Sequence, residues 1–252
     1  MRRMLLRVVR AARRRISGPA PVWTAVPGRD PIRLVAYYEE LAGYYPNCEM
    51  KTKRWFVENA GRDWVYLDCG ANVGYYSLLF SGLSPEGHVY AFEPTATHAM
   101  LLANLRDNGA RNVVAEKLAL GRESGTAEAA LQRVWGHATD RGAFPFTTVD
   151  DYVRERDIRR VDCIKVDVDS YDFDVLVGAR ATLERFDPWI VVELTDLALT
   201  LRGQFTTEVL RWLAAEGYGE GRVLEEANYL FRRRGLGDSA GDGPRLTLRF
   251  ER

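Results

Sequence analysis

Apolar runs alternate with amphipathic stretches between residues 63 and 234, and this alternation predicts an α/β domain. Each apolar run has the length of a buried strand, and the segments between the runs carry helical periodicity. Strands that alternate with helices form a mostly parallel sheet with helices on both faces. The predicted strands occupy residues 64–69, 88–94, 112–120, 162–169 and 188–194, with closing strands in 221–234.

The first of these runs passes directly into a glycine-containing turn. Gly70 and Gly74 are separated by three residues, whereas a dinucleotide site has the spacing G-x-G-x-x-G. Asp68 stands at the mouth of the turn, where a carboxylate repels a phosphate but suits a cation. S-adenosylmethionine carries an ammonium and a sulfonium and no phosphate, so the turn favours this cofactor. A dehydrogenase is an alternative that Asp68 weakens.

Three more side chains are candidates for the cofactor site. Glu93 ends the next strand, 25 residues after Asp68, near the spacing at which an acid binds ribose hydroxyls. Glu49 and Thr52 lie three residues apart in a helix predicted from Asn47 to Asn59, and therefore on one helical face. They either reach the amino-acid end of the cofactor or form an ordinary polar helix start.

Acidic residues end most of the predicted strands and should meet at one edge of the sheet, in a single cleft. We expect Asp167 to act as the base that activates a hydroxyl, with Asp169 as a second base or metal ligand. Asp169, Ser170 and Asp172 could instead cap the following helix. His137, in a loop that can overhang the cleft, is an alternative base. Trp135 and Tyr171 either stack on a sugar ring or belong to the core.

The ends of the chain differ in composition from this domain. Residues 1–29 hold eight arginines and no acid, although the formal net charge of the 252 residues is zero. The first 16 residues form a basic amphipathic pattern, which suits an anionic membrane surface or an acidic partner. We predict four parts: a basic leader and Pro-rich linker (1–31), a helical segment (32–62), the main domain (63–234) and a loose tail (235–252).

The cysteine content, the lengths of the apolar segments and the net charge indicate the cellular compartment and the class of partner. Three cysteines without a C-x-x-C pair indicate a reducing compartment. No stretch is long and apolar enough for a spanning helix, so we expect a cytoplasmic protein whose leader can touch the inner membrane surface. Residues 30–252 carry a formal charge of −8, which argues against nucleic acid as a partner. The sequence does not fix the oligomeric state.

Taken in order, the motifs resemble the FkbM family of S-adenosylmethionine-dependent methyltransferases. The resemblance runs from about Asp63 to Arg234. It rests on Leu67-Asp68-Cys69-Gly70-Ala71-Asn72-Val73-Gly74-Tyr75-Tyr76-Ser77, Val89-Tyr90-Ala91-Phe92-Glu93-Pro94, Leu118-Ala119-Leu120-Gly121, Thr147-Thr148-Val149-Asp150-Asp151, and Ile164-Lys165-Val166-Asp167-Val168 with Gly178-Ala179.

The resemblance implies a Rossmann-like class I methyltransferase fold, with a seven-stranded and mostly parallel sheet. It implies O-methylation of a hydroxyl on a sugar, glycan or natural product. It assigns Asp68, Gly70, Asn72 and Gly74, with the adjacent Tyr75, to the cofactor and Glu93 to its ribose. After Asp167 the family usually shows an acid, a glycine and, two residues on, a second acid. Here the run is Asp169-Ser170-Tyr171-Asp172, a departure that bears on the size of the acceptor.

Two alternatives remain, one within the enzymes and one from another functional class. One is methylation of a base or an amino group, which lacks support because no Asn-Pro-Pro-Tyr-like segment is present. The other is a non-catalytic module of the same fold that docks a partner through its Arg-rich N-terminus. The acids at the strand ends disfavour this second alternative. A divalent metal is compatible with the acids, but no metal-binding motif indicates one.

Overall fold

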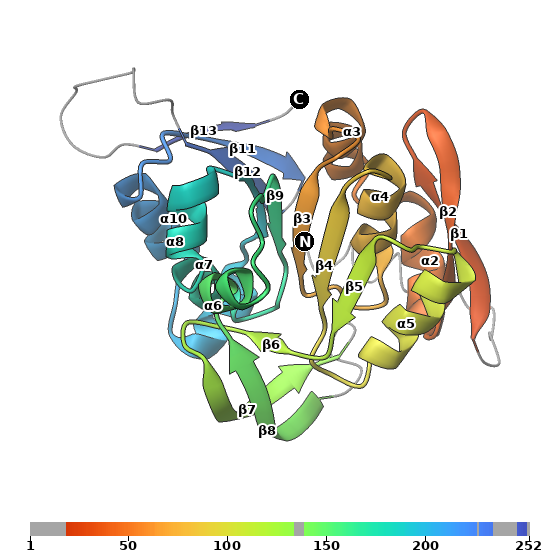
Figure 1. The fold of residues 1–252 in the computed structure, drawn as a ribbon, viewed down its shortest axis with the longest axis horizontal. Coiled ribbons are helices and arrows are strands. Elements are labelled where there is room, and N and C mark those ends of the chain that lie inside the picture. The colour runs from red at the N-terminus through yellow and green to blue at the C-terminus, as the bar shows by residue number, and fades with distance from the viewer. Residues whose placement is uncertain (1–18, 134–138, 226, 234–245, 251–252) are drawn as a thin grey trace.

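The computed structural model describes residues 19–133, 139–225, 227–233 and 246–250. An eight-stranded sheet forms its centre (Figure 1), in the order β13-β11-β12-β10-β9-β3-β4-β5. The strands are β13 (Thr247–Phe250), β11 (Glu220–Glu225), β12 (Asn228–Arg232), β10 (Trp189–Glu193), β9 (Cys163–Val166), β3 (Val65–Cys69), β4 (His88–Phe92) and β5 (Val113–Glu116).

The sheet confirms the predicted fold class. Strands β10, β9, β3, β4 and β5 are parallel neighbours, and β12 alone runs antiparallel, between β10 and β11. The chain winds from β3 outward to β5 and then returns to place β9 on the other side of β3. Such a reversal opens a crevice at the carboxyl ends of the two central strands, where α/β proteins bind ligands.

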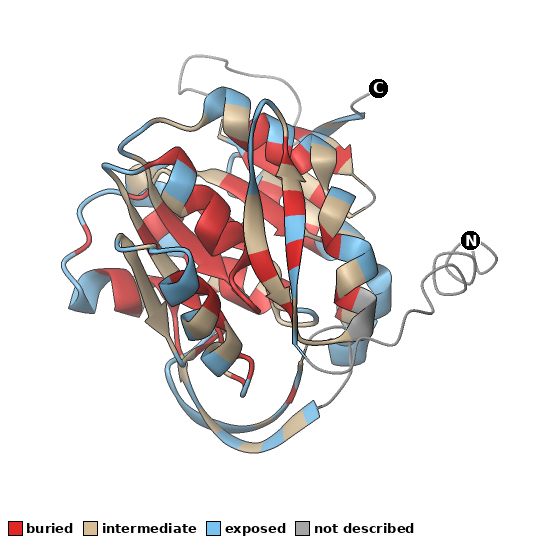
Figure 2. Cartoon of the chain, turned by 90° about the vertical axis from the view of Figure 1, so that its right-hand side faces the viewer, coloured by how far each residue is buried: buried red, intermediate tan, exposed pale blue. Residues whose placement is uncertain are grey.

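Helices cover both faces of this sheet (Figure 1). Because side chains on a strand alternate between faces, Tyr66 and Cys163 belong to one hydrophobic cluster and Leu67 and Ile164 to the other. Figure 2 shows the buried residues concentrated in this centre. The helices are α3 (Met50–Asn59), α4 (Tyr75–Leu83) and α5 (His98–Asp107) on the first face, and α6 (Val149–Glu155), α7 (Asp172–Val177), α8 (Arg180–Phe186) and α10 (Thr206–Ala215) on the second.

The N-terminal segment differs from its prediction. Instead of a linker and a helix over 32–42, an antiparallel hairpin of β1 (Ala20–Val26) and β2 (Arg29–Ala36) packs on the first face. Every second residue from position 22 to 26 is buried, which is the period of a strand. Prolines at 21 and 31 indicated a linker, but a two-stranded ribbon has only edge strands, where proline is tolerated. Among the described residues, the first helix is α2 (Glu39–Tyr44), which begins only after the hairpin.

A second hairpin lies below the sheet in Figure 1. Strand β7 (Gly125–Gln132) confirms the extra short strand that the sequence predicts over residues 125–133. The sequence indicates irregular structure over residues 134–140, and β8 (Thr139–Thr147) begins within this segment, at residue 139. Strands β7 and β8 pair in antiparallel register, and β8 also pairs with β6 (Ala119–Leu120). Trp135 and His137 lie outside the described residues, so their predicted roles stay predictions.

The C-terminal segment also differs in part. The tail was expected to be loose, but β13 pairs in parallel with β11 and gives the sheet its eighth strand. Apolar residues at 246, 248 and 250 alternate with polar ones, which is a strand pattern. The basic leader and the Gly-rich part of the tail lie outside the described residues. Among the residues that the structure describes, no helix is long and apolar enough to cross a membrane.

Candidate active site

A cavity of about 670 Å³ is lined by the carboxyl ends of β3, β4, β9 and β10 and by the β7–β8 hairpin. This volume is within the range of small-molecule sites. Two of the predicted site residues, Thr52 and Gly74, do not line it. The predicted residues that do are Glu49, Asp68, Gly70, Asn72, Tyr75, Glu93, Asp167 and Asp169.

The turn after β3 forms one wall, here called the turn side (Asp68, Gly70, Asn72 and Glu93). Gly70 has φ +87°, and a Cβ there would lie 1.8 Å from the backbone oxygen of Asp167. Only glycine therefore lets the turn pass so close to the end of β9. Gly74 begins α4 with φ +93°, and a Cβ on it would meet Leu101 of α5. Its role is helix packing, and contact with a ligand is not supported by its position.

The turn side holds buried oxygens that have no protein partner. Asp68 is 1% exposed, and its Oδ2 accepts a hydrogen bond from Ser77 Oγ at 2.5 Å, whereas its Oδ1 has none. The Oδ1 of Asn72, a residue with φ +51°, is likewise buried and unpaired. Burial raises the pKa of Asp68 to about 6, although the charge of Lys165 opposes the shift. Unpaired buried acceptors are costly, so this wall fits a ligand that donates hydrogen bonds or carries positive charge.

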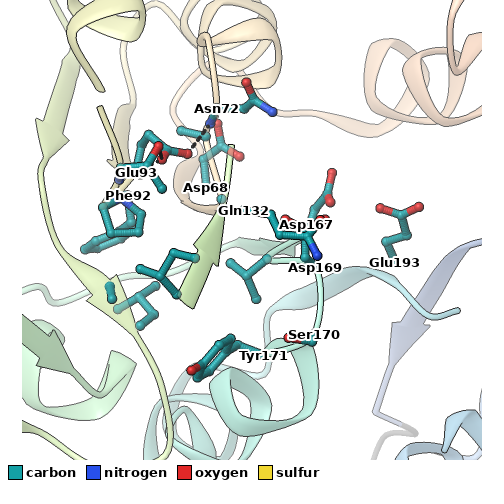
Figure 3. A pocket seen from close by; sticks show the side chains of 18 of the residues that line it. Asp68, Asn72, Phe92, Glu93, Gln132, Asp167, Asp169, Ser170, Tyr171 and Glu193 are labelled. Carbon is teal, nitrogen blue, oxygen red and sulfur yellow. Dashed lines mark hydrogen bonds between the residues drawn. The ribbon is translucent and has the colours of Figure 1, made fainter. Parts of the chain in front are cut away.

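Glu93 closes the turn side from β4. Its Oε2 accepts a hydrogen bond from the backbone N–H of Asn72 at 3.1 Å, and its Oε1 accepts two from Thr95. Figure 3 shows Glu93 and Asn72 together at one end of the cavity. These contacts hold the carboxylate in place. A carboxylate oxygen has two lone pairs, so Oε2 retains capacity for a ligand hydroxyl.

The opposite wall, here called the carboxylate side, consists of Lys165, Asp167 and Glu193. Lys165 is 1% exposed within β9, and its Nζ donates to Asp167 Oδ2 at 2.7 Å. The same Nζ lies 4.4 Å from the centre of the Tyr76 ring. Although burial opposes a charge on Lys165, nearby carboxylates, Asp167 first, raise its pKa, and the ammonium stays protonated.

The two carboxyl groups of this wall differ in charge. Burial opposes ionisation of Asp167, but the ammonium of Lys165 lowers its pKa below the usual value. The negative charge of Asp167 in turn raises the pKa of Glu193, and burial adds to the shift. We therefore describe Asp167 as the carboxylate and Glu193 as the carboxylic acid of the pair.

Residues 68–220 match the model of the methyltransferase FkbM domain, which is more than half of the chain. The chain belongs to this family. The resemblance that the motifs indicated is thereby confirmed, and membership in the FkbM family implies S-adenosylmethionine as the methyl donor.

Individual relatives are more distant. The chain is 24% identical over 152 residues to hexuronic acid methyltransferase AglP of Haloferax volcanii. This match covers 58% of the chain and 62% of that protein, so the chain spans less than two thirds of its length. An FkbM methyltransferase structure from Methylobacillus flagellatus KT shows 16% identity and a TM-score of 0.45, covering 68% of this chain and 44% of that one. A methyltransferase structure from Aquifex aeolicus shows 14% identity and a TM-score of 0.44, covering 71% and 87%.

Glu49 and Thr52 are separated in this FkbM chain. Glu49 has φ +46° and stands just before α3, so the three-residue spacing is not a helical one. Its side chain lines the cavity, and its Oε1 accepts a hydrogen bond from Asn228 Nδ2 at 2.8 Å. Thr52 is fully buried inside α3, and its backbone N–H donates to Glu225 Oε1. The expectation that both residues face one ligand is therefore not supported.

The run after Asp167 divides between the cavity and the helix that follows. Strand β9 ends at Val166, so Asp167 and Asp169 lie beyond the strand and both line the cavity. Burial, followed by the charge of Asp167, raises the pKa of Asp169 to about 6. Asp172 is buried, and its Oδ1 accepts a hydrogen bond from the backbone N–H of Val168, so its role is structural. Tyr171 lines the cavity.

Sequence reasoning placed Glu193 among the acids of the cleft but gave it no role, and it did not select Lys165. Lys165 is the one charged residue of the strand Cys163–Val166, and a charge inside a fully buried strand is a usable signal. Glu193 is recognisable as a strand-end acid, but its partner depends on the register of two strands. Within the described part of the chain, no three His, Cys, Asp or Glu side chains converge as a metal site requires.

Proposed function

We propose that this FkbM protein transfers the methyl group of S-adenosylmethionine to a hydroxyl of a sugar, glycan or natural product. One observation carries the proposal. A single cavity joins a turn with unpaired buried acceptors to a carboxylate that a buried lysine holds ionised. The first wall suits a cationic donor molecule, and the second suits a group that must lose a proton.

The turn side fits the donor molecule by its chemistry. The unpaired Oδ1 atoms of Asp68 and Asn72 would accept hydrogen bonds from its ammonium end, and Glu93 would accept from its ribose hydroxyls. When bound, the donor supplies a methyl group on a sulfonium, so that forming the new C–O bond breaks the S–C bond and leaves a neutral thioether. Ser77 and Thr95 fix the carboxylates of Asp68 and Glu93 before any ligand arrives.

Asp167 would take the proton of the acceptor hydroxyl. A carboxylate with a lowered pKa is a weak base towards a neutral alcohol, but an oxygen that is gaining a methyl group becomes strongly acidic. Proton transfer to Asp167 is therefore favourable as the C–O bond forms, and the carboxylate orients the oxygen beforehand. Lys165 supports this role because it keeps Asp167 ionised and in place.

The acceptor class is supported by the cavity and by one relative. Carboxylate, hydroxyl and aromatic groups from Asp169, Ser170 and Tyr171 extend the wall beyond Asp167, as recognition of a polyhydroxyl ring requires. The relative AglP is named a hexuronic acid methyltransferase, which makes a sugar hydroxyl the first acceptor to test.

Calorimetric titration with S-adenosylhomocysteine, and separately with NAD, tests the cofactor assignment. We expect the wild type to bind the first and not the second. Asp68→Ala should weaken binding by about 1–3 kcal/mol, the value of a hydrogen bond to a charged group. Binding of NAD, or no binding of S-adenosylhomocysteine to the wild type, would contradict the proposed function.

A further inference from the structure

Asp167 and Glu193 are brought together by strand register. Strands β9 and β10 are parallel, and Val166 is paired with Val192, so the next residues of the two strands are lateral neighbours. Neighbouring strands lie about 4.8 Å apart, and paired residues point to the same face. Figure 3 shows the two side chains adjacent at the cavity, with Glu193 on the side away from Glu93. Each carboxyl group shifts the pKa of the other, as expected for two neighbouring acids in one site.

A hydrogen bond between two carboxyl groups requires one proton, because two carboxylates offer only acceptors. Lys165 decides which group keeps the proton, since its Nζ donates to Asp167. A proton shared by the pair would therefore reside on Glu193 and point towards Asp167. The other titratable groups that act on Glu193 are Asp172, at the start of α7, and Tyr44, at the end of α2.

On its other side Glu193 has a polar neighbour in the sheet. Glu193 is paired in the sheet with Asn228 of β12, which runs antiparallel to β10. Asn228 donates its side-chain N–H to Glu49 at 2.8 Å, so the strand ends carry a continuous polar row from Asp167 to Glu49. Lys165 holds Asp167 at one end of this row and Asn228 holds Glu49 at the other, so Glu193 lies between two groups of fixed position.

We propose that Glu193 is the positioning residue of the reaction: its carboxylic acid proton holds Asp167 in the orientation that receives the acceptor's proton. This inference rests on the proposed function, because it needs Asp167 to be the base. It assigns Glu193 a neutral, donating role. Glutamine keeps the size and one N–H donor, so it should substitute for glutamic acid here, whereas alanine should not.

Infrared spectroscopy tests the shared proton without any ligand. At pH 8 the wild type should show the carbonyl bands of protonated, buried carboxylic acids, because burial also raises the pKa of Asp172 well above its usual value. The band assigned to Glu193 is the one that changes in the variants. The band should be lost in Glu193→Gln and in Asp167→Asn, and kept in Glu86→Gln, which changes a surface carboxylate paired with Arg62. A carbonyl region that Glu193→Gln leaves unchanged would overturn the inference, because the proton would belong to another group, such as Asp172.

Kinetics with radiolabelled S-adenosylmethionine and the methyl glycosides of glucose, galactose and glucuronic acid test the positioning role. We expect Glu193→Gln to keep kcat within about fivefold, and Glu193→Ala to lower kcat by up to about 100-fold, as misplacement of a reacting group does. The KM for the donor and the affinity for S-adenosylhomocysteine should not change. Wild-type kcat in Glu193→Ala would overturn the role, and so would a Glu193→Gln variant as inactive as Asp167→Asn.

The pH profile separates this role from a second base. Loss of the Glu193 proton at high pH should lower the wild-type kcat, and this limb should disappear in Glu193→Gln because the amide does not titrate. A limb that persists in Glu193→Gln would assign the titration elsewhere and overturn the inference. If the wild type binds S-adenosylhomocysteine and shows the infrared band but methylates no glycoside, the proposed acceptor class fails while the shared proton stands.

Discussion

The two walls of the cavity are built in different ways. The turn side comes mainly from one short stretch of chain, in which Asp68, Gly70 and Asn72 follow one another and Glu93 is added from the next strand. The carboxylate side depends on register between β9 and β10, and its surroundings come from the loop before α3 and from β12. The first wall is a local motif, and the second is a product of the assembled sheet. Substitutions should therefore affect binding and catalysis separately.

The largest effect should come from the carboxylate side. Asp167→Asn removes the group that receives the proton, so we expect kcat to fall by about 10²–10⁴, the contribution of a general base. The affinity for S-adenosylhomocysteine should stay within about twofold, because the turn side is intact. Asp169→Asn, in the same loop and also in the cavity, is the matched comparison and should cost less. Equal losses in both variants would contradict the assignment of Asp167 as the principal base.

Gly70 lies where the turn side meets the carboxylate side, so a substitution there should distort both walls of the cavity. Gly70→Ala places a Cβ 1.8 Å from the backbone oxygen of Asp167, at a φ of +87° that alanine rarely adopts. We expect the free energy of unfolding to drop by about 3 kcal/mol or more, as strain and a steric clash add. Urea unfolding measures this loss. Gly28→Ala, with φ +65° and no atom within 4 Å, isolates the cost of the backbone angle and should lose only about 1 kcal/mol.

At the turn side, substitution of Asp68 should increase stability at high pH and weaken ligand binding. The pKa of Asp68 is raised from 3.8 to about 6, so its ionisation is less favourable in the folded chain than in the unfolded chain. The free energy of unfolding therefore decreases as pH rises through this interval, by up to about 3 kcal/mol at 1.36 kcal/mol per pH unit. Asp68→Asn should remove this decrease and raise Tm at pH 8 but not at pH 4, while S-adenosylhomocysteine binds about 10-fold to 100-fold more weakly. A Tm difference that is the same at both pH values would contradict the shift.

The sequence predicts the turn side better than the carboxylate side, because the first is a local motif and the second depends on strand register. The turn side was predictable because an apolar run, an acid and two glycines stand together, and their spacing alone indicates the ligand type. Asp167 and Asp169 were predictable as strand-end acids of a parallel sheet. Glu193 was visible as a strand-end acid, but its pairing with Asp167 requires the register of β9 and β10, which no local pattern contains.

The segments outside the parallel sheet were harder to predict. Proline and glycine in residues 19–31 indicate a linker when the sequence alone is considered. The pairing of β1 with β2 shows that these residues form a hairpin instead. Glu49 illustrates the same limit at a single residue. A helix was predicted to begin after Asn47, but the chain takes a left-handed step at Glu49 first, and this step separates Glu49 from Thr52.

The smallest expected effect tests whether Thr52 lies apart from Glu49 and from the cavity. Thr52 is fully buried, does not line the cavity, and its hydroxyl has no hydrogen-bond partner among the described residues. Thr52→Val keeps the shape and removes an unpaired polar atom, so we expect the free energy of unfolding to rise by about 1 kcal/mol. Glu49→Gln is the variant for comparison, because Glu49 lines the cavity and Thr52 does not. Calorimetry should show unchanged affinity for S-adenosylhomocysteine in Thr52→Val. A loss of affinity in Thr52→Val would show that Thr52 belongs to the cofactor site, because this isosteric change should not otherwise alter the turn side.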